Sequence, residues 1–302
     1  MLNTKYNLTK LLCKVLPPIL AQTVRTYLIS IKQGEVLAKD FTRKSFTGSY
    51  FFGNTSDFHA FKFSIHGFFD WRNVILTRKI ISKLKKGDII EVGANIGTET
   101  ISFADIAKKN ELKVYAYEPV LSNLDYIKIF KEKNNLDNLI IKDSLVSDYN
   151  GVANFKVPTK NDSGSGFISD NDNDQEFKVV KLDDENFGNI SVLCIDVEGF
   201  EYQVLKGSLN LITIQRPYII VEVNKNYLQN RSKISLNDFH NFIKELDYTP
   251  YYIKALGLEL VDINNFKTLP NKNWICIPNS DLQNKKTLDK TIFLNALNPF
   301  NN

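Results

Sequence analysis

The chain has 302 residues, enough for one large domain with an appendage, and a composition of 43% hydrophobic and 24% charged residues predicts a soluble protein with a sizeable core. Its net charge is +4, but the basic residues are scattered among 34 acidic ones, so the clustered basic face of a nucleic-acid-binding protein is absent and no nucleic-acid partner is expected. Three widely separated cysteines, in no C-x-x-C arrangement, argue against a disulfide framework or a zinc site and predict a cytoplasmic protein.

Residues 1–72 are predicted to form an appendage that precedes the main domain. Residues 5–33 have the apolar spacing of one or two amphipathic helices, interrupted by two adjacent prolines. The simplest interpretation is a helix packed on the domain, and a helix at a membrane surface or between two subunits is the alternative. No apolar run approaches the length of a membrane span. Residues 41–72 contain nine phenylalanines, and the alternation at 61–65 predicts short strands or extended loops that could wall the pocket of an acceptor substrate.

The main domain, residues 73–280, is organised around a strand, a glycine turn and a helix. After a predicted helix at 73–85, an apolar run at 88–92 is short enough for a buried strand, and a helical pattern follows the glycines. Glycine permits a tight turn that a ligand approaches closely. The turn lacks the G-x-G-x-x-G spacing of dinucleotide sites, and Glu91 would repel a pyrophosphate but attract a cationic group.

An acidic residue follows the next predicted strand, at 112–117. Glu118 comes 21 positions after Gly97, about the spacing at which doubly wound folds place the acid that binds ribose hydroxyls. A glycine turn, a preference for a cationic group and a ribose acid together predict a nucleoside ligand with an amino-acid end.

The rest of the pattern continues an α/β fold. Two added strands at 151–158 and 176–182, joined by a turn-rich loop, predict a hairpin that lies over the carboxyl edge of the sheet as a lid on the acceptor side. Residues 281–302, rich in asparagine and lysine, are predicted as a C-terminal tail. The other predicted elements are helices at 122–133 and 236–246 and strands at 139–141, 190–196, 218–223, 249–253 and 274–277.

Two motifs give the sequence a family resemblance between about residues 80 and 225. The first is E-V-G-A-N-I-G at 91–97 with Glu118-Pro119, and the second is C-I-D-V-E-G-F-E at 194–201 with L-K-G at 205–207. Together they resemble the FkbM family of S-adenosylmethionine-dependent methyltransferases. The resemblance implies a Rossmann-like class I fold, with a mainly parallel seven-stranded sheet, helices on both faces and an antiparallel edge. The family usually carries a lysine where this chain has Cys194, so the positive charge that relatives have at this position is absent here.

The resemblance also implies S-adenosylmethionine as the cofactor and a set of residues that bind it. Asn123 and Ser144-Leu145 fall where the family lines the adenosine, although a helix cap and an ordinary loop are equally good readings of these residues. The full expected set is Glu91, Gly93, Ala94, Asn95, Gly97, Thr98, Glu118, Pro119, Asn123, Ser144, Leu145 and Asp196.

Methyl transfer to a hydroxyl requires in-line alignment and a base. Asp196 and Glu198, at the end of a predicted strand, are the first candidates, with Glu222 and His66 as further ones; His66 is preferred over His59 because it is closer in sequence to the domain. In the alternative interpretation, Asp196 binds only the backbone or the cofactor, and Glu198 caps the helix that begins near Gly199. No metal is expected, although Asp196, Glu198 and Glu222 have the oxygen donors that hold a divalent cation in some proteins.

The acceptor implied by the resemblance is a hydroxyl on a small molecule or saccharide, such as a cell-surface glycan or a glycosylated metabolite. A cofactor-binding module without catalysis is the main alternative. A nicotinamide-dependent oxidoreductase is disfavoured by the glycine spacing and by Glu91.

Overall fold

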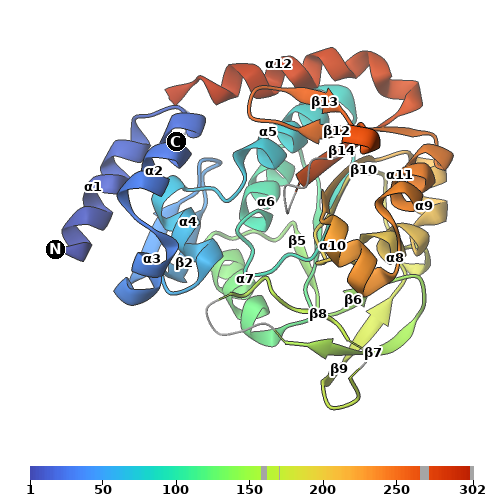
Figure 1. Ribbon diagram of the computed structural model, residues 1–302, viewed down its shortest axis with the longest axis horizontal. Coiled ribbons are helices and arrows are strands. Elements are labelled where there is room, and N and C mark those ends of the chain that lie inside the picture. Colours follow the sequence, from blue (N-terminus) through green and yellow to red (C-terminus); the bar gives the residue numbers. More distant parts are fainter. Residues whose placement is uncertain (158–161, 170, 266–271, 300–302) are drawn as a thin grey trace.

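The computed structural model describes residues 1–157, 162–169, 171–265 and 272–299. Part of the turn-rich loop predicted between the two added strands lies outside these residues. A large twisted sheet forms the centre of the molecule, with the N-terminal appendage on one side and a smaller sheet at the bottom (Figure 1).

The central sheet has eight strands in the order β13-β12-β14-β11-β10-β3-β4-β5. Neighbouring strands from β5 to β11 are parallel, and β14 is antiparallel to both of its neighbours, as predicted for the edge. One strand more than the predicted seven is present, because β13 pairs with the outer side of β12. The bounds are β3 (Asp88–Val92), β4 (Val114–Tyr117), β5 (Leu139–Lys142), β10 (Ile190–Ile195), β11 (Tyr218–Val223), β12 (Tyr248–Ile253), β13 (Leu258–Leu260) and β14 (Lys272–Pro278).

Helices cover both faces of this sheet, so alternate side chains of its strands enter two separate cores. Ile89 and Cys194 face the core that contains α5, α6, α7 and α12, whereas Ile90 and Leu193 face the core that contains α8, α9 and α11. Burial on both sides explains why the parallel strands are continuous apolar runs. The bounds are α5 (Trp71–Lys79), continued by a π-helical turn (Ile80–Leu84), α6 (Thr100–Lys108), α7 (Leu121–Lys133), α8 (Glu201–Lys206), α9 (Leu209–Gln215), α10 (Lys225–Tyr227), α11 (Leu236–Glu245) and α12 (Lys285–Ala296).

The strand order reverses between β3 and β10. From β3 the chain adds β4 and β5 on one side, and later adds β11 on the far side of β10. In open α/β sheets the crevice at such a reversal, at the carboxyl ends of the strands, is where ligands bind. The turn that follows β3 and the acids that follow β10 therefore meet at one edge.

The appendage consists of α1 (Leu2–Lys14), α2 (Pro18–Leu28), α3 (Ile31–Leu37), the hairpin β1 (Asp40–Lys44) and β2 (Tyr50–Asn54), and α4 (Phe58–His66). The hairpin agrees with the predicted short strands, but residues 61–65 are helical, so that part of the prediction is wrong. Asp57 caps the N-terminus of α4, and Gly67 ends it with φ 77°. Phe61, Phe63 and Ile65 are all buried, because α4 packs on several sides and shows no exposed face in its sequence.

The inserted segment forms a four-stranded sheet in the order β6-β9-β7-β8 rather than a simple hairpin. Its antiparallel pair, β7 (Gly151–Lys156) and β9 (Gln175–Val180), matches the two predicted strands, while β6 (Leu145–Val146) and β8 (Phe167–Ile168) are two-residue additions.

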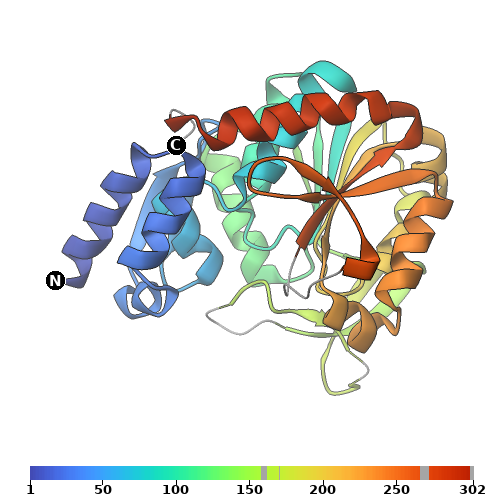
Figure 2. The same cartoon turned by 45° about the horizontal axis from the view of Figure 1, so that its top comes forward.

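The C-terminal segment, predicted as a tail, contains α12. Its Leu288, Ile292 and Ala296 are buried in the same core as α5. Figure 2 shows α12 running across the domain towards α2, with which it is in contact. Among the described residues, no helix has the length and apolarity that crossing a membrane requires.

Candidate functional site

The turn after β3 uses positive backbone angles and packs directly on the neighbouring loop. Gly93, Asn95 and Gly97 have φ of 89°, 52° and 84°, the left-handed region that favours glycine and tolerates asparagine. A Cβ at Gly93 would collide with the carbonyl oxygen of Asp196, and one at Gly97 would collide with the Phe130 ring. The glycines are therefore required by close packing of the turn itself.

Glu118 holds this turn in place. One carboxyl oxygen accepts a hydrogen bond from the backbone N–H of Asn95 at 2.9 Å. The other accepts from the backbone N–H of Val120 at 2.9 Å and from Asn123 Nδ2 at 3.2 Å. Burial raises the pKa of Glu118 to about 7, although these hydrogen bonds act in the opposite direction. The acid thus lies beside the turn, as its spacing predicted, and it also orders the turn, which the sequence did not indicate.

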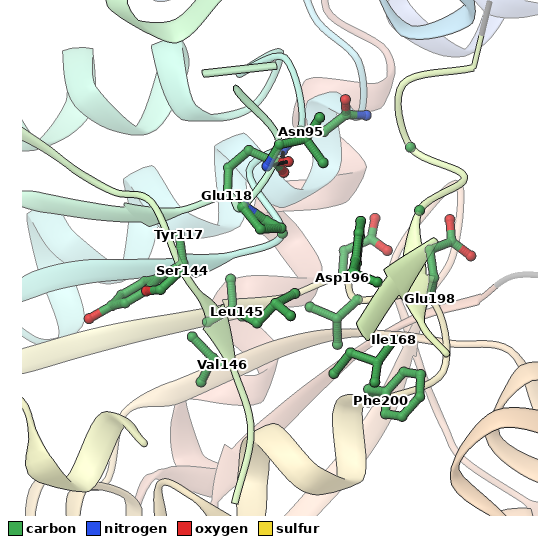
Figure 3. A pocket seen from close by; sticks show the side chains of 18 of the residues that line it. Asn95, Tyr117, Glu118, Ser144, Leu145, Val146, Ile168, Asp196, Glu198 and Phe200 are labelled. Atoms are coloured by element: carbon green, nitrogen blue, oxygen red, sulfur yellow. Dashed lines mark hydrogen bonds between the residues drawn. The ribbon is translucent and has the colours of Figure 1, made fainter. Parts of the chain in front are cut away.

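A narrow cavity of about 80 Å³ lies between this turn and the inserted sheet. Figure 3 shows Glu118 at one end and Asp196 and Glu198 at the other, with Ser144, Leu145 and Val146 along one side. Apolar walls with acidic groups at the two ends suit a flat heterocycle joined to a sugar. The apolar walls are Tyr117, Val120, Leu145, Val146, Phe155, Ile168 and Phe200.

The inserted segment closes the narrow cavity. Ser163, Gly164, Gly166 and Ile168 line it, whereas only Asp162 of this segment, among the described residues, lines the neighbouring cavity. The lid, predicted on the acceptor side, therefore lies mainly over the narrow cavity and only at its edge over the wide one. It is held there because the Ser163 amide donates to Asp57 at 3.0 Å and Asn123 donates to the Ser163 carbonyl at 3.1 Å.

A wide cavity of about 640 Å³ adjoins the narrow one. The appendage supplies one wall through Phe58, Lys62 and Phe69, and β12 and the segment after it supply another. Lys62 lies 3.9 Å from the centre of the Phe69 ring, and burial lowers the pKa of this lysine to about 8. Six residues line both cavities, which therefore meet at His59, Val92, Gly93, Asn95, Asp196 and Glu198.

Three carboxylates converge at this junction. Oxygen atoms of Asp196, Glu198 and Glu222 lie within 4.8 Å of one another. Asp196 is exposed to the cleft but enclosed by protein atoms, and burial raises its pKa. Burial and the nearby Asp196 raise the pKa of Glu222 well above its usual range, and Glu222 donates a hydrogen bond to Asp196. The hydrogen bond between the two groups raises the pKa of Glu222 and lowers that of Asp196, so of the two acids Glu222 is the better placed to carry a shared proton. The donor set also suits a divalent cation, so the absence of a metal stays a prediction.

Glu198 has a different environment. Its φ is 56°, an uncommon value for a residue other than glycine, and its carboxylate lies 3.6 Å from Arg231 Nη1. Arg231 also donates to the Glu198 carbonyl and lies between the rings of Phe167 and Tyr227, 3.9 Å from the centre of each. Burial and Asp196 raise the pKa of Glu198 to about 8, while Arg231 lowers it. Arg231 thus connects the lid to the carboxylate cluster.

Two buried acids line the wide cavity beside the turn. Glu91 is 5% exposed, and its Oε2 atom has no hydrogen-bond partner among the described residues. Burial raises the pKa of Glu91 to about 8, and burial also raises the pKa of Glu99 well above its usual range. A cationic ligand group would stabilise the ionised form of both acids.

The structure does not bring His66 to the cleft. Its ring is 2% exposed, stacks on Phe68 at 5.3 Å and lines neither cavity. His59 lies at the junction instead, where its Nδ1 is 3.4 Å from the Ser163 hydroxyl. Burial lowers the pKa of His59 to about 4, so it is neutral near pH 7. The preference for His66 came from distance along the sequence, but the helical turn of α4 places His59 on the cavity side.

Most residues expected to bind the cofactor line one of the cavities. Gly97 and Asn123 line neither and act through packing and through Glu118. Those on the narrow cavity are Gly93, Asn95, Glu118, Pro119, Ser144, Leu145 and Asp196, and those on the wide cavity alone are Glu91, Ala94 and Thr98. Residues at the site that were not in the expected set are His59, which was the less preferred histidine, and Tyr117, Ile168, Phe200, Tyr227 and Arg231. Tyr117 directly precedes Glu118-Pro119 and Phe200 lies within the second motif, which is the signal that could have marked them.

The geometry defines the class of protein. A parallel sheet that reverses at β3 and β10, an antiparallel edge, a glycine turn preceded by a buried acid and a second acid after β4 are the features of a class I S-adenosylmethionine-dependent methyltransferase. A family model for the methyltransferase FkbM domain matches residues 91–250. The chain belongs to the FkbM methyltransferase family, and its cofactor is S-adenosylmethionine.

Solved structures of low sequence identity are similar to the chain. The FkbM methyltransferase of Methylobacillus flagellatus KT has a TM-score of 0.43 and 16% identity, over 85% of this chain and 60% of its own. This chain thus spans about three fifths of that protein. A putative methyltransferase from Streptococcus mutans, in complex with SAH, has a TM-score of 0.40 and 14% identity, over 68% and 94% of the two chains.

A third similar structure is that of a tRNA methyltransferase. The tRNA (uracil-54, C5)-methyltransferase of Pyrococcus abyssi has a TM-score of 0.39 and 13% identity, over 78% of this chain and 43% of its own. These comparisons do not identify the acceptor, and the expectation that nucleic acid is not a partner stays a prediction. A comparison with curated proteins found no match.

Proposed function

We propose that this methyltransferase transfers the methyl group to a hydroxyl of a saccharide, in a glycan or a glycosylated metabolite. The observation that carries the proposal is the junction of the two cavities at Asp196 and Glu198. A methyl donor in the narrow cavity and an acceptor in the wide one would meet at two carboxylates. The free, buried cysteines fit the proposed cytoplasmic location.

The narrow cavity suits the nucleoside of the cofactor. Glu118 lies at the end where ribose hydroxyls would bind, and the apolar walls would contact the adenine. The unpartnered oxygen of Glu91 would accept from the ammonium group of the methionine part. When bound, the cofactor supplies an electrophilic methyl group on a cationic sulfur.

The reaction needs a base for the acceptor proton. As the acceptor oxygen attacks the methyl carbon, the carbon–sulfur bond breaks, and its electron pair stays on sulfur. Asp196 would take the hydroxyl proton, because its ionised form is stabilised by the hydrogen bond from Glu222. The products are a methyl ether, S-adenosylhomocysteine and a protonated Asp196.

The wide cavity has the polar groups that hydroxyl recognition requires. Asp70 forms an ion pair with Arg72 at 2.9 Å, and Asn273 contacts Asp70 and Asn73 at 3.4 Å each. Aromatic rings of Phe58 and Phe69 lie on the same wall. A ring with apolar faces and hydroxyl edges fits both kinds of surface.

Calorimetry and a transfer screen test the proposal. The protein is expected to bind S-adenosylmethionine and S-adenosylhomocysteine but not NAD, and to transfer labelled methyl groups to saccharide extracts, with and without a chelator. Labelling of RNA but not of saccharides would contradict the proposed acceptor. Cofactor binding without any S-adenosylhomocysteine product would instead support a binding module.

Thermal stability of the free protein is expected to fall as the pH rises from about 5 to about 9. Glu91 and Glu118 have pKa values of about 8 and about 7, raised from 4.5, so their contribution is complete below pH 4.5 and is lost as the pH rises through the folded values. Scanning calorimetry should show a melting temperature lower by at least about 5 °C.

The cofactor should oppose this loss because it brings positive charge to the acids. S-adenosylmethionine is therefore expected to raise the melting temperature more at the higher pH, and more than S-adenosylhomocysteine, which lacks the sulfonium charge. A melting temperature independent of pH, or equal shifts by both ligands at both pH values, would contradict the assigned electrostatics.

Replacing Arg231 with methionine should move the acidic limb of the pH–rate profile to higher pH. Arg231 lowers the pKa of Glu198, which lies beside the proposed base Asp196. Removing Arg231 raises the pKa of Glu198, so the carboxylate cluster reaches its ionised form at higher pH, by about one unit. Lys254→Met is the control, because Lys254 lines the wide cavity but pairs with Glu259. An unmoved limb in Arg231→Met would remove Glu198 from the titrating groups.

A further inference from the structure

Helix α1 has two apolar faces, and only one of them is packed. Tyr6 and Cys13 are buried in a small core with Ala21, Phe61 and Ile65 of α2 and α4. The opposite face exposes four apolar residues at helical spacing, which therefore form one stripe. They are Leu8, Leu11, Leu12 and Val15, with 52%, 63%, 37% and 65% of their surface exposed.

The charge around this stripe has one sign. Residues 1–34 contain five basic residues and no acidic one, although the whole chain has 34 acids. On the helix, Lys5 lies along one side of the stripe and Lys14 along the other, and both are exposed. None of the five basic residues forms an ion pair within the part of the chain that the structure describes.

The stripe lies where a large surface could reach it. Figures 1 and 2 both place α1 at the outer end of the molecule, on the far side of the appendage from the central sheet. On its other side α1 packs against α4, whose Phe58, His59 and Lys62 line the wide cavity. A surface bound at α1 would therefore be one helix layer away from the element that walls this cavity.

A second copy of the chain or a lipid bilayer could cover such a stripe, and the charge around it distinguishes the two. In a twofold dimer the same patch meets itself, so Lys5 and Lys14 would face basic residues of the second copy without any acid of residues 1–34 to pair with them. An anionic bilayer offers both an apolar boundary for the leucines and negative headgroups for the lysines.

We propose that α1 is an interfacial helix that binds the protein to the surface of an anionic lipid bilayer. Leu8, Leu11, Leu12 and Val15 enter the boundary between headgroups and acyl chains, and the flanking lysines contact the headgroups. The proposal rests on the exposed face of α1 and is independent of the methyl acceptor.

Cosedimentation of the full chain with vesicles tests it. Binding is expected to vesicles of phosphatidylcholine with phosphatidylglycerol, and to be at least tenfold weaker to phosphatidylcholine alone. The double variant Leu11→Asn, Val15→Asn should bind the anionic vesicles at least tenfold more weakly. Lys5→Gln with Lys14→Gln should also weaken binding, by roughly tenfold, and make it less sensitive to salt.

The matched control is Ile214→Asn on α9, because Ile214 is an apolar residue with 79% exposure far from α1 in the sequence. This variant should bind vesicles as the wild type does, and all variants should keep the wild-type melting temperature. Failure of the wild type to bind anionic vesicles would overturn the proposal. So would a dimer in light scattering that dissociates in the α1 double variant, which would assign the stripe to a second copy.

Discussion

Replacing Asp196 with asparagine is expected to slow methyl transfer by roughly 10²–10⁴-fold, the usual contribution of a general base, while binding of S-adenosylmethionine changes by no more than about threefold. Asparagine has the size of aspartate and keeps a hydrogen-bonding oxygen, but it cannot accept the acceptor proton. Asp196 lies where the two cavities meet. With both ligands bound, a water molecule cannot take over its role as the base without displacing one of them. Single-turnover measurement of S-adenosylhomocysteine, with binding followed by calorimetry, separates the two effects.

The neighbouring acid provides the control for this prediction. Glu222→Gln keeps a hydrogen-bond donor towards Asp196, and burial and Asp196 raise the pKa of Glu222, which favours its protonated form. The rate of methyl transfer by Glu222→Gln is therefore expected to stay within roughly tenfold of the wild-type rate, because only the strength of the hydrogen bond changes. If Glu222→Gln lost as much activity as Asp196→Asn, the proton assignment between the two acids would be reversed. Unchanged turnover in Asp196→Asn would remove Asp196 as the base.

The sequence predicted the parts of the site that depend on local backbone geometry. Gly93 and Gly97 could be assigned to the site because a tight turn between strand and helix needs residues in the left-handed region. Glu118 could be assigned because its strand is adjacent to the turn. Both features belong to one βαβ unit, in which spacing along the chain fixes spacing in space.

The parts that the sequence did not predict depend on contacts between distant segments. The sequence of α4 reads as alternating because most of its side chains are buried. His66 was preferred over His59 for its position along the chain, although the helix places His59 on the cavity. Arg231 meets Phe167 and Glu198 only through the fold, since no spacing connects an inserted strand with a turn after β11. Local patterns carry no information about such contacts.

Replacing Glu118 with alanine is expected to weaken binding of S-adenosylmethionine by at least about 100-fold. The change leaves three donors, the amides of Asn95 and Val120 and the side chain of Asn123, without their acceptor, at a cost of about 1–3 kcal/mol for each that stays buried and unpaired. It also removes the proposed partner of the ribose hydroxyls. Calorimetry measures the affinity, and Glu132→Ala on the exposed side of α7 is the matched control.

A comparison of ligands separates the ribose contact from the support of the turn. Wild-type protein should bind adenosine at least about tenfold more tightly than 2′-deoxyadenosine or 3′-deoxyadenosine, because a lost hydrogen bond to a charged group costs about 1.5–3 kcal/mol. In Glu118→Gln, which keeps one carbonyl oxygen and preserves the volume, that discrimination should shrink. If the variant is folded and discriminates as well as the wild type, Glu118 supports the turn alone, and another group must bind the ribose.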